Sequence, residues 1–80
     1  MASSLNRELG ELIAAKLASG ALPSTVPTSI IRSMGAGLRC SACDVSIGLD
    51  QIETECTFAD GQWLRLHLEC FREWRQQRAP

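Results

Sequence analysis

Two pairs of metal-binding residues restrict this sequence more than any other feature. Cys40 and Cys43 form a C-x2-C pair. After residues 44–66, His67 and Cys70 form an H-x2-C pair. Each pair places two thiolate or imidazole donors about one tight turn apart, and a tetrahedral Zn²⁺ site needs two such pairs facing each other. Four protein ligands leave no coordination position for a substrate or a water molecule, so the spacing predicts one structural Zn²⁺.

The length of the chain makes such a site important for stability. A domain of 80 residues buries only a modest core, whereas zinc binding linked to folding supplies on the order of 10 kcal/mol at neutral pH. Disulfides are the alternative explanation for four cysteines. The histidine within the ligand pattern and the lack of a signal-peptide-like stretch near Met1 favour zinc and a cytoplasmic location. No segment approaches the roughly 18 apolar residues of a membrane span.

Residues 1–22 are assigned to an N-terminal amphipathic helix segment, with the helix itself predicted from Ser4 to Ser19. Apolar residues recur at the helical spacings i, i+4, i+7, i+8 and i+12, at Leu5, Leu9, Leu12, Ile13 and Leu17. Gly20 occupies a C-cap position, and Pro23 follows it as a helix stop. In a small domain such a stripe more often packs on the rest of the chain than on a membrane. We expect a monomer, or a weak dimer through this helix.

Residues 23–37 are predicted to be a connector rich in Pro, Ser, Thr and Gly. Pro23 and Pro27 exclude a regular helix at their positions, although residues 29–34 have room for one short helical turn. Gly35 and Gly37 then lead into the first ligand pair, where glycine permits the close backbone approach that a metal-binding turn requires.

The part of the chain between the ligand pairs has the pattern of a β-hairpin. Residues 52–58 alternate between apolar and polar positions, which indicates a strand with one buried and one acidic face. Asp60-Gly61 is typical of a hairpin turn, and residues 63–67 supply the return strand.

A second helix is predicted from Leu68 to about Gln77. The four residues His67, Cys70, Phe71 and Trp74 share one face of it, so two ligands and two aromatic rings lie together. The helix N-terminus favours a thiolate at Cys70. Residues 38–78 therefore predict a small α+β zinc module with the order zinc turn, β-hairpin, helix, which is the order of a treble-clef finger.

This module also resembles known zinc modules. The similarity covers residues 38–75 and is carried by Cys40-Ser41-Ala42-Cys43, Ile47, Gly61, Trp63, His67-Leu68-Glu69-Cys70-Phe71 and Trp74. The segment resembles the treble-clef fingers of the poly(ADP-ribose) polymerase type and, more loosely, the first module of LIM domains. With residues 15–23 ahead of it, the whole arrangement is similar to small bacterial proteins with a single CCHC finger. The resemblance implies the fold and a zinc ion held by Cys40, Cys43, His67 and Cys70.

The chain departs from both families in ways that bear on function. Polymerase-type fingers that bind DNA breaks have a longer loop between the ligand pairs and a basic surface. Here the charged residues from 40 to 64 are all acids, namely Asp44, Asp50, Glu53, Glu55 and Asp60. LIM domains pair two modules in tandem, and this sequence has ligands for one.

Cys56, and Cys70 together with His67, have residue types that also suit roles other than structural zinc binding. Cys56 lies on the apolar face of the predicted strand, where a lone cysteine is expected to be a small buried hydrophobe rather than a ligand or redox group. His67 and Cys70 match a nucleophilic pair by residue type alone, but no third orienting group or oxyanion site accompanies them. We expect no enzymatic activity.

The arginines Arg65, Arg72, Arg75 and Arg78 are the remaining candidates for contact with a partner or with phosphate. Helical spacing offers Arg72 a pairing with Glu69 and offers Arg78 the ring of Trp74. Two functions stay open: a zinc-stabilised interaction module that binds another protein, or a nucleic-acid-binding finger that uses these arginines. The net charge of −1, the acidic middle segment and the few aromatic residues favour the first.

Overall fold

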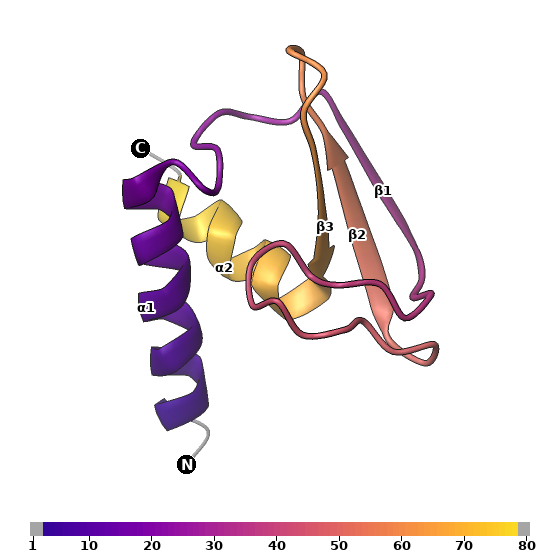
Figure 1. Cartoon of the computed structure of the whole chain (residues 1–80), viewed down its shortest axis with the longest axis horizontal. Helices are drawn as coiled ribbons and strands as arrows, with labels where there is room; N and C mark the ends of the chain where they lie inside the picture. Colours follow the sequence, from indigo (N-terminus) through magenta and orange to yellow (C-terminus); the bar gives the residue numbers. More distant parts are fainter. Residues whose placement is uncertain (1–2, 79–80) are drawn as a thin grey trace.

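The computed structural model describes residues 3–78, with side chains described from residue 7 onward. The described chain is a small α+β fold with two helices and a three-stranded antiparallel sheet (Figure 1). Its elements follow in the order α1 (Ser3–Ser19), β1 (Ser29–Met34), β2 (Ile52–Thr57), β3 (Trp63–His67) and α2 (Leu68–Arg78). Within the described residues, no helix is both long and apolar enough to cross a membrane.

The predicted hairpin and second helix are confirmed. Strands β2 and β3 pair antiparallel, with Glu53 opposite His67 and Thr57 opposite Trp63. Gly61 has a φ of +92°, a backbone conformation that glycine adopts without strain, and its amide donates to the Phe58 carbonyl oxygen at 3.0 Å. The turn therefore forms where Asp60-Gly61 predicts it, and it sets the register that places His67 at the end of β3.

The connector predicted for residues 23–37 is partly wrong, because it contains strand β1 instead of a helical turn. Ser29–Met34 pairs antiparallel with β2, from Ser29 opposite Thr57 to Met34 opposite Ile52. Its β-branched Ile30 and Ile31 favour an extended backbone. All six residues of the strand are exposed, so no alternation between buried and exposed positions marks it in the sequence.

The N-terminal helix predicted from Ser4 to Ser19 is confirmed, since α1 spans Ser3–Ser19. Ile13 is fully buried, and Leu9 and Leu17 pack against the core, whereas Leu12 is 37% exposed. Residues 1–2 and the side chain of Leu5 lie outside the described part of the chain. Gly20 follows the helix with a φ of +84°, which is the conformation predicted for a C-cap.

Helix α2 links the other elements into one core. It packs against β2 and β3 on one side and against α1 on the other (Figure 1). Phe58 and Trp74 meet edge to face with ring centroids 6.1 Å apart. The Trp74 indole N–H donates to the Pro23 carbonyl oxygen at 2.8 Å, and the Gln77 amide donates to the Gly10 carbonyl oxygen at 2.8 Å. These bonds join α2 to α1 and to the segment that follows α1.

The docking of α1 predicts different effects for two neighbouring substitutions. We expect Ile13→Ala to lower the free energy of unfolding by about 2–4 kcal/mol, because it leaves a cavity in the core. Leu12→Ala is the matched control, with an expected loss below about 1 kcal/mol because the side chain is already partly exposed. Urea unfolding of both variants in the presence of Zn²⁺ checks this. Equal losses would mean that α1 does not pack as described.

Candidate metal centre

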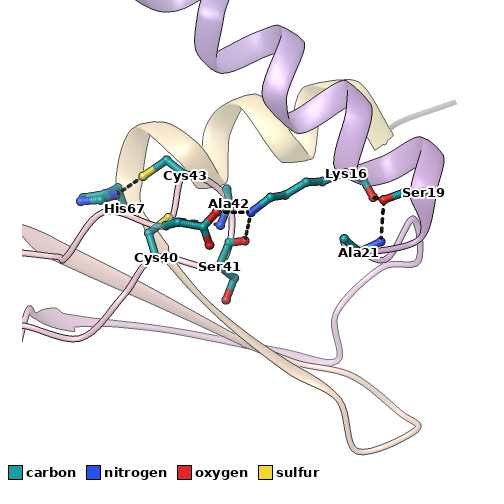
Figure 2. A network of polar contacts seen from close by, with 9 residues as sticks. Lys16, Ser19, Ala21, Cys40, Ser41, Ala42, Cys43 and His67 are labelled. Atoms are coloured by element: carbon teal, nitrogen blue, oxygen red, sulfur yellow. Dashed lines mark hydrogen bonds and ion pairs between the residues drawn. The ribbon is translucent and has the colours of Figure 1, made fainter.

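The four predicted ligands converge on one point of the structure. The donor atoms of Cys40, Cys43, His67 and Cys70 all lie within 4.8 Å of one another. The His67 Nδ1 atom is 3.4 Å from the Cys43 sulfur (Figure 2), and it is 3.8 Å from the Cys70 sulfur. A tetrahedral ion with metal–sulfur distances of about 2.3 Å separates its donors by about 3.8 Å. The donor set therefore fits Zn²⁺ in both chemistry and spacing.

The first ligand pair lies in a tight turn that follows Gly35 and Gly37 and precedes strand β2. The Asp44 amide donates to the Cys40 carbonyl oxygen, and the Cys40 amide donates to the Val45 carbonyl oxygen, both at 3.0 Å. Asp44 has a φ of +66°, a left-handed conformation that aspartate tolerates better than most residues. The Ala42 amide points at the Cys40 sulfur at 3.4 Å, so a backbone dipole stabilises a thiolate there.

Gly35, which precedes the first ligand pair, packs closely against residues 47–48, which follow that pair. A Cβ atom built on Gly35 would clash with the Gly48 carbonyl oxygen and would lie 2.8 Å from the Ile47 side chain. The Gly35 amide donates to the Gln51 carbonyl oxygen, and the Gly37 amide donates to the Ile47 carbonyl oxygen. The predicted close backbone approach at Gly35 is thus confirmed by its contacts.

The second ligand pair spans the junction of β3 and α2. His67 is the last residue of β3, and Cys70 lies in the first turn of α2. The His67 Nε2 atom is 3.2 Å from the Ser46 carbonyl oxygen. A carbonyl oxygen only accepts, so Nε2 carries the proton and Nδ1 offers its lone pair to the site. A backbone partner of this kind orients a metal-binding histidine.

Mutual electrostatics keep the three thiols from ionising together. A hydrogen bond with Cys70 lowers the pKa of Cys40 to about 4. The same bond with Cys40, reinforced by burial, raises the pKa of Cys70, and burial raises the pKa of Cys43. The favoured thiolate is therefore Cys40, and the thiolate predicted at Cys70 from the helix N-terminus is wrong because the hydrogen bond with Cys40 and burial raise the pKa of Cys70. A divalent cation, when bound, supplies the positive charge that three adjacent thiolates require.

Lys16 of helix α1 also contacts this centre, although no pattern in the sequence distinguishes it. The Lys16 ammonium donates to the Ser41 carbonyl oxygen at 3.1 Å, inside the first ligand turn (Figure 2). It also pairs with the Asp44 carboxylate at 2.9 Å and lowers the pKa of that group. Lys16 looks like an ordinary solvated helix lysine, and only the three-dimensional packing of α1 identifies its role.

The other candidate residues lie apart from the four ligands. Cys56 is fully buried in the hydrophobic core and is outside the donor cluster, as its position on the strand predicted. Arg65 is 3.3 Å from the Glu53 carboxylate and lies over the Trp63 ring at 4.7 Å. This pairing explains why Glu53 is only 8% exposed although its face of β2 was predicted to be an acidic surface.

The three arginines of α2 have different surroundings. The Arg78 guanidinium lies 4.6 Å from the Trp74 ring centroid, which confirms the predicted stacking. The predicted pairing of Arg72 with Glu69 is wrong, because no ion pair joins them although both residues are described. Arg72 and Arg75 are exposed.

The assignment of the metal centre rests on its geometry, because comparison with known proteins found no match. No family matches the chain, and neither a curated protein nor a solved structure is significantly similar to it.

We expect the purified protein to contain one Zn²⁺ per chain and Cys40→Ser to lose it, because a hydroxyl replaces a buried thiolate ligand. Elemental analysis gives the metal content, and circular dichroism with and without chelator reports folding. A folded protein without zinc, or a Cys40→Ser variant that keeps both zinc and fold, would contradict the assignment.

Cys56→Ala should leave the metal content unchanged, since its sulfur is outside the donor cluster. We expect a stability loss of about 1 kcal/mol from the small cavity. The same elemental analysis and a thermal melt measure the two effects. Loss of zinc in this variant, together with its retention in His67→Ala, would show that the fourth ligand is Cys56.

Proposed function

We propose that this chain is a non-catalytic, zinc-stabilised interaction module of the treble-clef type, and that it binds another protein. The order of its parts supports the fold type: a turn with Cys40 and Cys43, the β2–β3 hairpin, and helix α2 with Cys70 in its first turn. A bound Zn²⁺ closes this arrangement, which otherwise has a small core.

The donor set supports a structural role for the metal. Four protein donors within 4.8 Å of one another complete a tetrahedral shell. Catalytic zinc sites instead keep one position for water or substrate. The imidazole of His67 is held by the Ser46 carbonyl oxygen, so it has no free proton-transferring nitrogen once Nδ1 binds a metal.

The observation that carries the proposal is the free edge of strand β1. The sheet order is β1-β2-β3, so β1 has a hydrogen-bonded neighbour on one side only. The strand is fully exposed, and Ile30, Ile31 and Met34 are 47%, 56% and 59% exposed. In Figure 1, β1 lies at the margin of the molecule away from α1. A free apolar edge strand pairs readily with an extended segment of another protein.

Interaction through β1 predicts loss of partner binding when the strand edge is altered. Ile31→Lys places a charge on an exposed edge residue, which opposes pairing without opening a cavity. Immobilised wild-type protein and this variant are exposed to extract from the source cells, and captured proteins are compared by mass spectrometry. We expect a protein to be captured by the wild type and lost with Ile31→Lys.

The matched control is Leu49→Lys, which changes another apolar residue, 73% exposed, in the loop before β2 and outside the β1 edge strand. Metal content and melting temperature are measured for all three proteins. A partner that binds the wild type and both variants equally would place the interaction elsewhere on the surface.

A further inference from the structure

Helix α2 carries a basic hollow that no internal acid neutralises. Arg72, Arg75, Gln76 and Arg78 line a hollow of about 570 Å³. The ion pairs of the described residues are Lys16 with Asp44 and Arg65 with Glu53. The three arginines of the hollow therefore have no carboxylate partner within the described chain. Unpaired arginines grouped on one helix face are suited to binding carboxylates or phosphates.

A fourth arginine extends this charge toward strand β1. The Arg32 guanidinium lies 5.5 Å from the ring centroid of Phe71, one residue before Arg72. Arg32 pairs with the buried Thr54 of β2, so its side chain is on the face of the sheet that α2 covers. Burial raises the pKa of the Cys56 thiol, whereas the charges of Arg78 and Arg32 oppose this rise. Both arginines therefore lie near the same core residue.

The link between α2 and strand β1 is the contact of Arg32 with Phe71, the residue that precedes Arg72. Helix α2 packs on β2 and β3 and leaves β1 uncovered. A segment that extends the sheet beyond β1 places every second side chain on the face that α2 occupies. Those side chains would lie beside Arg32 and next to the arginines of α2. Acidic residues at these alternate positions would complement the charge.

We propose that the edge of β1 and the arginines Arg32, Arg72, Arg75 and Arg78 together bind an extended acidic segment of a partner protein. This inference rests on the proposed function and specifies the chemistry of the partner. Backbone pairing with β1 supplies the orientation, and carboxylates at alternate positions supply the charge-assisted hydrogen bonds.

A second copy of this chain is a poor occupant of the same edge. A two-fold axis perpendicular to the sheet pairs a residue of β1 with its own copy, so the registers with the greatest overlap centre on Ile31 or on Arg32. The two Arg32 side chains would then approach each other, and the two α2 helices would lie on the same face. The arginines of both copies would repel one another.

Nucleic acid is also a poorer fit than an acidic polypeptide. Single strands are held by exposed aromatic rings on which bases stack. The exposed residues of β1 are aliphatic or polar, and Trp63, which is 52% exposed, lies in β3 and is covered by Arg65. Phe71 and Trp74 are buried. The face beside β1 therefore offers charge and a strand edge but no stacking surface.

The test is a titration of the zinc-loaded protein followed by two-dimensional NMR. The probe is a capped peptide of about ten residues in which valine alternates with glutamate, which places all carboxylates on one face of a strand. Two further peptides are compared: one with glutamine for every glutamate, and one with proline for every valine. Duplex and single-stranded nucleic acid are titrated at about 150 mM salt.

We expect the valine–glutamate peptide to shift the amide signals of residues 29–34 and 72–78, and to bind at least about tenfold more tightly than the glutamine peptide. The double variant Arg72→Gln/Arg75→Gln should weaken this binding roughly tenfold. The matched control Arg7→Gln/Arg39→Gln removes the same charge from exposed positions elsewhere and should change it less than about twofold.

The outcomes distinguish the proposed binding of a protein through β1 from the further inference that the bound segment is acidic. Equal binding of the glutamate and glutamine peptides would overturn the acidic preference and leave protein binding through β1 intact. If the proline peptide binds as tightly as the valine–glutamate peptide, charge acts without strand pairing. That result would overturn a site formed jointly by the β1 edge and the arginines. Failure of the valine–glutamate peptide to bind also overturns this inference, while loss of a captured partner in Ile31→Lys still supports the proposed function. Sub-micromolar nucleic-acid binding that disappears in Arg72→Gln/Arg75→Gln would replace both with a nucleic-acid interface.

Discussion

The structure depends on one constraint, which is that the turn of the first ligand pair must face the junction of β3 and α2. Backbone contacts hold the two sides together around the four donors. The Ser41 amide donates to the Arg65 carbonyl oxygen at 2.7 Å, and the Arg65 amide donates to the Ser41 hydroxyl oxygen at 3.1 Å. Cys40 and Cys70 lie in the same buried cluster as Phe71 and Trp74. The metal site and the hydrophobic core are therefore one unit rather than two.

The parts that sequence analysis predicts correctly are those encoded by local spacing. The hairpin follows from alternation and Asp60-Gly61, and α2 and the four ligands follow from their short intervals. Strand β1 was missed because its six residues are all exposed and its pairing with β2 is long-range. The Lys16 contact and the burial of Glu53 against Arg65 were missed for a related reason: each depends on a partner that is distant in the sequence.

The two edges of the sheet differ in a way that bears on function. The edge at β3 is occupied by the first ligand turn, through the bonds between Ser41 and Arg65. The edge at β1 has no such cover among the described residues. The first ligand turn thus occupies the β3 edge at Arg65, whereas the β1 edge of the described sheet is available for pairing with a further strand.

The contact between Lys16 and the first ligand turn has a consequence for metal exchange. Lys16 belongs to α1, whereas Ser41 and Asp44 flank the ligands Cys40 and Cys43. Docking of the helix and retention of the ion are therefore thermodynamically linked, and each changes the equilibrium of the other by the same factor. A molecule that drew α1 away from α2 would therefore weaken the binding of zinc at this site. A chain saturated with metal would in turn resist proteases that attack a detached helix.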